Sequence, residues 1–184
     1  MASASLTLPR SELHALLLRA ARGAGVPQSH GEDLARAVAA HGGSRAVSAA
    51  CRALGRRWRV PGYALDGNTV IFPRARAVEC LPVAIDALQA DVEAAELADI
   101  DEPDLVAPFV AQAARVGRAN LAMRASETGV VLEHGREAAP APRQGRVEVA
   151  AEVHDLLSRF AARTYVAATA ASRAGAGAGA IDND

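Results

Sequence analysis

The residues best suited to bind a ligand gather near the C-terminus. Arg163, Thr164 and Tyr165 are consecutive, and Ser172 and Arg173 follow a short segment later. Arginine binds carboxylates through paired hydrogen bonds, and threonine and tyrosine supply hydroxyl groups. Three further polar residues close the chain: Asp182, Asn183 and Asp184. We expect these residues to form a ligand- or partner-binding site, and the segment offers no triad and no evident base for catalysis.

A second group of charges surrounds the only tryptophan, Trp58. Its members are Arg52, Arg56, Arg57 and Arg59. A basic run with an aromatic residue can bind phosphates or stack on bases. However, the acidic stretch 91–104 nearly balances this run, and the net charge of the chain is −1. We therefore expect no nucleic-acid partner, and a solvated helix end with the tryptophan anchoring the following turn.

Cysteine and histidine show no pattern of a metal or catalytic site. No two histidines have the helical i, i+4 spacing, and no CxxC motif is present. Nothing local supplies a base to Cys51, and Glu79 beside Cys80 raises the pKa of that thiol. All basic side chains are arginine, which excludes a Walker lysine, a Schiff base and a pyridoxal-phosphate anchor. The sequence predicts two buried free thiols, no metal and no cofactor.

The composition is that of one folded domain spanning residues 1–184. Hydrophobic residues make up 51% and charged residues 22%, which is typical of a globular chain. Aromatic residues make up only 3%, so the core must consist of leucine, valine, isoleucine and alanine. The N-terminus lacks the pattern of a signal peptide, and no stretch has the length and apolarity of a membrane span. We expect a cytoplasmic protein with no membrane partner.

Apolar spacing predicts helices in the first third of the chain. They span residues 11–22, 32–41 and 44–54. Ser11 and Ser44 are candidate N-caps, and residues 27–29 form a predicted turn. These helices would make an N-terminal helical hairpin or bundle, residues 1–60.

After residue 60 the spacing of the apolar residues changes, which predicts a small sheet with packed helices. The predicted strands are 68–72, 120–125, 129–133 and 146–149. The predicted helices are 79–91, 105–117 and 151–163. Pro82 makes the start of the first of these helices uncertain. The whole is an α+β fold with a mostly antiparallel sheet in residues 61–163 and a C-terminal tail, residues 164–184.

The tail contains an alternating glycine and alanine run, residues 174–180. Such a run has no side chains to pack and a high entropic cost of ordering, so composition alone favours a disordered end. The alternative is an extended segment laid across the protein or against a partner.

Two segments together resemble a bacterial family, the domain of unknown function 3726. Residues 18–25 read LRAARGAG, and residues 163–184 read RTYVAATAASRAGAGAGAIDND. The resemblance implies no activity, but it favours an ordered tail. Ala167 and Ala170 stand where the family pattern has proline and glutamate, and residues 29–31 replace a tryptophan–glycine pair. These departures weigh against an enzymatic role.

We therefore expect an accessory or small-subunit protein of small-molecule metabolism, working with a protein partner or a second copy of itself. The alternative is a small enzyme acting on an anionic metabolite, a carboxylate or a phosphate, through Arg163, Tyr165 and Arg173. The sequence leaves open whether the protein is an enzyme.

Overall fold

The computed structural model describes residues 4–117, 119–135 and 145–164. Its helices are α1 (Arg10–Gly23), α2 (Gln28–His41), α3 (Ser44–Leu54), α4 (Ala77–Gln89), α5 (Val106–Arg115) and α6 (Ala151–Ala162), with one 3₁₀ turn, η1 (Pro103–Leu105). Its strands are β1 (Ser5–Leu8), β2 (Ala64–Asp66), β3 (Thr69–Phe72), β4 (Ala94–Ala98), β5 (Leu121–Ala125), β6 (Gly129–His134) and β7 (Val147–Ala150). The predicted α+β class is confirmed.

The main sheet has the strand order β2-β3-β4-β6-β5. Its neighbours are antiparallel except for β3 and β4, which run parallel, so the predicted mostly antiparallel sheet is correct. Parallel strands need a crossover, and α4 supplies it between β3 and β4. The carboxyl ends of these two strands therefore lie side by side at one edge of the sheet.

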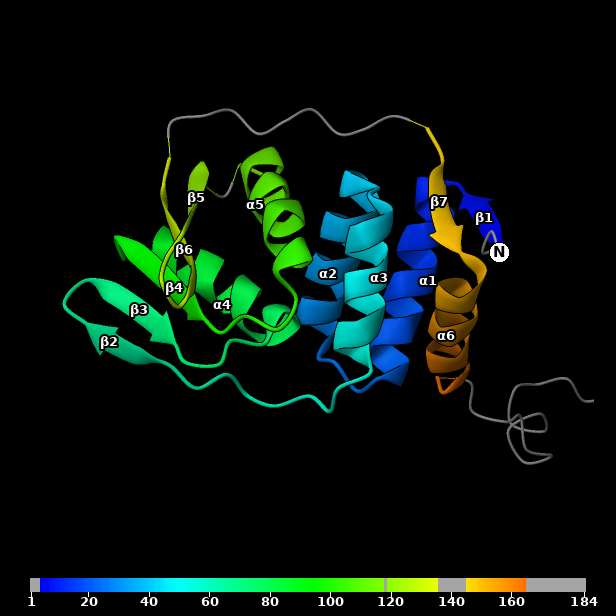
Figure 1. Cartoon of the computed structure of the whole chain (residues 1–184), viewed down its shortest axis with the longest axis horizontal. Coiled ribbons are helices and arrows are strands. Elements are labelled where there is room, and N and C mark those ends of the chain that lie inside the picture. Colours follow the sequence, from blue (N-terminus) through cyan, green and yellow to red (C-terminus); the bar gives the residue numbers. More distant parts are fainter. Residues whose placement is uncertain (1–3, 118, 136–144, 165–184) are drawn as a thin grey trace, which may run out of the picture.

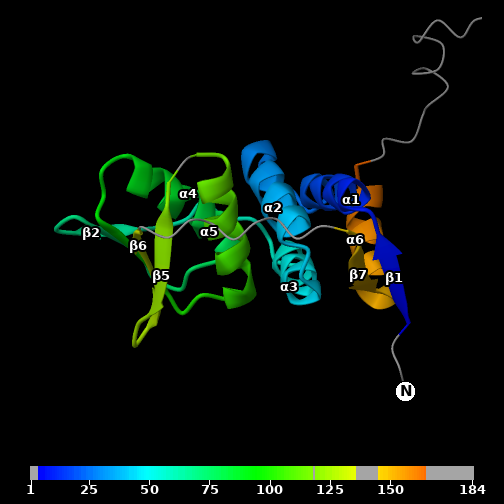
Figure 2. The same cartoon turned by 90° about the horizontal axis from the view of Figure 1, so that it is seen from above.

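The elements are stacked in layers (Figures 1 and 2). Helices α4 and α5 cover one face of the sheet, and together with β2–β6 they form what we call the sheet lobe. Helices α2 and α3 lie beyond them, followed by α1, α6 and a ribbon of β1 and β7; these elements form the helical lobe. The chain passes from the helical lobe into the sheet lobe and returns for β7 and α6. Helix α2 packs against α4 and α5, so the two lobes share one buried core.

Small residues let the helices approach one another closely. Alanines at the α1–α2 contact, such as Ala21 and Ala35, are fully buried. At Gly23, an added Cβ would lie 1.8 Å from the carbonyl oxygen of Phe160 on α6. Only glycine permits this approach, which explains part of the ARGAG segment as packing. The glycine two residues later, Gly25, adopts a left-handed φ of 80°, which ends the turn.

The strand predicted at 146–149 was assigned to the wrong sheet. It is β7, and it pairs with β1 in a separate antiparallel ribbon, with Ser5 opposite Ala150 and Leu8 opposite Val147. Strands β1, β2 and β4 were not predicted. Strand β4 has the sequence AAELA, and pairing with β3 and β6 on its two sides overrides its helical propensity.

Two predicted caps are also wrong. The N-cap of α1 is Pro9, so Ser11 lies inside the helix, and the N-cap of α3 is Gly43, so Ser44 is its first helical residue. Helix α2 begins at Gln28, within the predicted turn 27–29, because Pro27 takes the N-cap position. The helices α5 and α6 and the hairpin of β5 and β6 lie where they were expected.

Candidate functional site

Only the first two residues of the predicted C-terminal cluster are described. Arg163 is the C-cap residue directly after α6, and its guanidinium carbon lies 4.9 Å from the ring centroid of Phe160. The Thr164 hydroxyl donates to the carbonyl oxygen of Ala161 at 2.7 Å. Both side chains thus make local contacts at the end of the helix. The remaining predicted site residues, Tyr165, Ser172, Arg173, Asp182, Asn183 and Asp184, lie outside the described residues, as does the glycine and alanine run.

A different group of charged residues meets at the carboxyl ends of β3 and β4. The loop after β3 contains Arg74 and Arg76, and the loop after β4 contains Asp99 and Asp101. Arg74 and Asp99 both adopt the left-handed backbone conformation, with φ of 52° and 46°. Non-glycine residues take this conformation at a cost, and such residues cluster at ligand-binding sites.

Backbone hydrogen bonds fix these two loops to each other. The Ala75 N–H donates to the Ala98 carbonyl at 2.7 Å, and the Asp101 N–H donates to the Ala75 carbonyl at 3.0 Å. The Ala77 N–H at the start of α4 donates to Asp101 Oδ1 at 2.8 Å. The left-handed residues are therefore held on a rigid frame.

A strap, residues 55–63, joins α3 to β2 and covers one side of these loops. Arg76 Nη1 donates both to the Arg57 carbonyl at 2.6 Å and to Glu79 Oε1 at 2.7 Å. The Arg59 N–H donates to the same Glu79 oxygen at 2.8 Å. The Trp58 ring packs edge-on against His30 of α2, with ring centroids 4.7 Å apart. The prediction that Trp58 anchors this turn agrees with that contact.

Two ion pairs attach the loop after β4 to α3 and the strap. Arg52 binds Glu102 through both carboxylate oxygens, with Nε at 3.0 and 3.1 Å and Nη2 at 2.6 Å. Arg56 pairs with Asp101. The hydrogen bonds to Glu102 raise the pKa of Arg52. The basic run and the acidic stretch, which the sequence showed only as balancing charges, are thus direct partners.

These elements enclose an open hollow of about 480 Å³. Its lining residues are Arg56, Arg59, Val60, Pro61, Gly62, Pro73, Arg74, Ala75, Arg76, Glu79, Cys80, Asp99 and Asp101. Arg56, Arg76, Glu79 and Asp101 use their charges in the ion pairs above. Within the described part of the chain, the side chains of Arg59, Arg74 and Asp99 have no hydrogen-bond or ion-pair partner. The hollow therefore presents two unpaired guanidinium groups and one carboxylate.

The lining offers charge but no activated nucleophile. Burial raises the pKa of the Cys80 thiol to about 11, so this group stays protonated at neutral pH. None of the lining residues is a histidine, serine, threonine or tyrosine. Among the described residues, no three histidine, cysteine, aspartate or glutamate side chains gather to hold a metal ion. The arrangement suits recognition of an anion.

The sequence carries a signal for this site that the predictions did not use. Polar residues follow two apolar strand segments: Arg74 and Arg76 come after residues 69–72, and Asp99 and Asp101 come after residues 94–98. Because β4 was not predicted, the parallel pair and its carboxyl edge were not predicted either. Such edges commonly hold ligands in sheets with parallel strands.

Comparison with known proteins finds no match: no protein-family model, no curated protein and no solved structure matches the chain. In the described ranges, no helix is long and apolar enough to cross a membrane.

Proposed function

We propose that the protein is a non-catalytic binding protein for a small polar metabolite that carries a phosphate or carboxylate group. The observation that carries this proposal is the pair of unpartnered guanidinium groups, Arg59 and Arg74, at the edge of a rigid hollow. Arginine suits both anions because its planar fork donates two parallel hydrogen bonds.

The size and the remaining charge of the hollow narrow the ligand class. A volume of about 480 Å³ falls within the roughly 300–1,000 Å³ of small-molecule sites. The Asp99 carboxylate accepts hydrogen bonds and repels a second anion. The ligand therefore carries its hydroxyl groups beside a single anionic group, as a sugar phosphate or a sugar acid does.

Thermal unfolding of the full chain with a panel of phosphates, sugar phosphates and hydroxy acids tests this proposal. A ligand that binds the native state raises the melting temperature. Replacing Arg59 or Arg74 by alanine should weaken binding by about 10- to 100-fold, as expected for a lost charged hydrogen bond. Arg159→Ala, an exposed arginine on α6 in the other lobe, is the matched control. Equal affinity of all three variants would refute the site.

A second candidate function is the accessory or subunit role, in which this ligand site serves a partner protein. It is favoured by three exposed apolar side chains in or just before β2: Val60, Tyr63 and Leu65 are 85%, 59% and 67% exposed, and Val60 also lines the hollow. The outer edge of β2 has no neighbouring strand among the described residues. Purification from the native host tests it. A monomer that retains no partner would count against the role.

We also propose a cytoplasmic location and membership of the domain of unknown function 3726 family. The described cysteines, Cys51 and Cys80, are both free, which suits a reducing compartment. The family proposal rests on residues 18–25 and 163–184. Part of the first segment has a packing role of its own at Gly23.

A further inference from the structure

The outer edge of β2 is open to a further strand. All three residues of β2, Ala64–Asp66, are exposed, and no strand pairs with its outer side among the described residues. The large side chains of Leu65 and Tyr63 are exposed with it. An unprotected edge is a template for pairing, because its outward N–H and C=O groups lack partners, and proteins usually guard it with basic residues or proline. β2 contains neither, so its edge is available for docking.

Positive charge gathers where β2 begins. Residues 60–62 line the anion hollow and lead into the strand, and the unpaired Arg59 and Arg74 lie in the same lining. The side chain of Arg57, on the strap, also has no hydrogen-bond or ion-pair partner within the described ranges. Together with Asp99, these unpaired groups are three guanidiniums and one carboxylate, which leaves a net charge of +2 at this end of the strand.

One segment of the chain complements both features. Residues 174–184, AGAGAGAIDND, lie outside the described residues, and Asp182 and Asp184 give them a charge of −2. Residues 174–180 carry no side chain larger than a methyl group, so their backbone can approach a strand edge closely. Their alternation has the period of a strand, because successive side chains of a strand point to opposite faces. The uncharged run suits the edge, and the acidic end suits the arginines.

The position of the charges sets the direction of pairing. β2 follows residues 60–62, which line the hollow, so the strand runs away from the hollow. A segment that brings Asp182 and Asp184 to the hollow must run towards it, because residues 174–180 come earlier in the sequence. The docked segment is therefore antiparallel to β2, and antiparallel pairing is the more stable kind.

We propose that residues 174–184 of a second copy of this chain bind to the edge of β2. Their backbone adds a strand to the sheet, and Asp182 and Asp184 meet Arg59 and Arg74. This inference rests on the proposed anion hollow and gives it a protein ligand. Docking occupies the guanidinium groups, so self-association and small-anion binding exclude each other.

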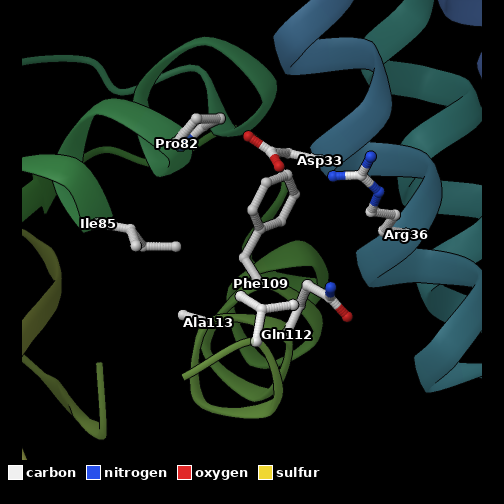
Figure 3. A pocket seen from close by; sticks show the side chains of 8 residues that line it. Asp33, Arg36, Pro82, Ile85, Phe109, Gln112 and Ala113 are labelled. Carbon is white, nitrogen blue, oxygen red and sulfur yellow. The ribbon is translucent and has the colours of Figure 1, made fainter. Parts of the chain in front are cut away.

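The arrangement of the lobes favours a second copy over the same chain. Helix α6 and β2 lie at opposite ends of the molecule, with α1, α2 and α5 packed in series between them (Figures 1 and 2). Figure 3 shows Phe109 of α5 beside Asp33 of α2, and the hollow there, about 90 Å³, is too small to pass a chain. Residues 165–173 extend to about 30 Å. A path round three helix contacts of about 8–10 Å each and the sheet beyond them is longer.

Analytical ultracentrifugation of the full chain at rising concentration tests the proposal. The chain should self-associate, and the double variant Asp182→Asn/Asp184→Asn should weaken association by about 10-fold or more, as for lost charged hydrogen bonds. Leu65→Glu should weaken it too, because the charge would be covered by the docked strand. Met123→Glu, at an exposed apolar residue of the other edge strand, β5, is the matched control and should change nothing. A monomer at every concentration up to millimolar, or equal association of the two glutamate variants, would overturn the proposal.

A mixture of two deficient variants identifies the second copy. Arg59→Ala/Arg74→Ala keeps the acidic segment and loses the acceptor, whereas Asp182→Asn/Asp184→Asn keeps the acceptor and loses the acidic segment. The mixture should associate more tightly than either variant alone. A labelled peptide of residues 174–184 should bind to the Asp182→Asn/Asp184→Asn chain and not to the arginine variant. Peptide binding by a chain that stays monomeric, with no gain in the mixture, would assign the edge to the chain's own segment and overturn the second copy.

Small anions separate failure of this inference from failure of the metabolite site. At low protein concentration, where the copies are apart, the best anion of the panel should bind, and at high concentration it should dissociate the assembly. Anion binding that depends on Arg74, in a chain that never associates, would refute this inference alone. Association that depends on Asp182 and Asp184, with no small anion bound, would support this inference and refute the metabolite site.

Discussion

Removal of the Arg52 side chain probes the contact that fixes the anion hollow to the helical lobe. The Glu102 side chain is only 5% exposed, and Arg52 supplies three of its contacts at 3.1 Å or less. In Arg52→Ala, the nearest remaining cation would be Arg56, whose Nη2 is 3.8 Å from Glu102 Oε1. A buried carboxylate would then be left poorly compensated.

The expected cost follows from the unequal burial of the two partners. Breaking a fully buried pair costs about 3–5 kcal/mol, and an exposed pair contributes about 0–1 kcal/mol. Because the Arg52 side chain is 56% exposed, solvent screens part of the effect. We expect a loss of about 2 kcal/mol, which for a chain of this size lowers the melting temperature by about 4–8 °C.

Urea denaturation of Arg52→Ala and of a control variant, Arg124→Ala, measures this cost. Arg124→Ala breaks an exposed ion pair with Glu133, in which the side chains are 57% and 41% exposed, and should change stability by less than about 0.5 kcal/mol. The slope against urea should be unchanged in both variants. A loss in Arg52→Ala no larger than that of Arg124→Ala would refute the reasoning.

The other predictions concern packing, pH and the tail. Gly23→Ala would place a Cβ on the Phe160 carbonyl and should lower the free energy of unfolding, measured by urea denaturation, by about 1–3 kcal/mol. The control Gly62→Ala, whose added Cβ meets open space, should leave stability unchanged. Equal effects of the two substitutions would contradict the close contact between α1 and α6. Burial raises the pKa of Cys80 to about 11, so the free energy of unfolding should fall between about pH 9 and pH 11, by at most about 1.4 kcal/mol per unit. Stability falls with rising pH because the thiol ionises at lower pH in the unfolded chain than in the folded one. A Cys80→Ala variant whose free energy of unfolding falls equally over this pH range would contradict burial of Cys80 as the cause. Deleting residues 175–184 should change stability by less than about 1 kcal/mol and abolish partner binding or activity, and a fully functional truncated chain would show the tail to be a linker.

Local pattern predicted the elements whose apolar residues face one core. The helices α1, α5 and α6 and the β5–β6 hairpin have clear helical or alternating spacing, and they form where expected. Strand β7 was predicted as a strand, but its partner β1 lies far away in sequence: Ser5 and Glu148, which share a hydrogen bond, are 143 residues apart. No local pattern specifies such a pairing.

The candidate site was harder to predict because it depends on one strand. The alanine-rich segment 94–98 gives little strand signal, and only its position between β3 and β6 makes it a strand. Without it, Asp99 and Asp101 read as part of an acidic loop. The two charge runs, around Trp58 and in 91–104, were visible, but the Arg52–Glu102 contact that joins them spans 50 residues.

The most direct test of the proposed anion site is an amide chemical-shift titration of the full chain with its best-binding phosphate or hydroxy acid. We predict that the largest shifts fall on residues 74–78 and 99–101, whose backbone frames Arg74 and Asp99. The shifts should saturate, and Arg74→Ala should remove them. Saturable shifts confined to residues 163–184, or none at all with any ligand of the panel, would contradict the account.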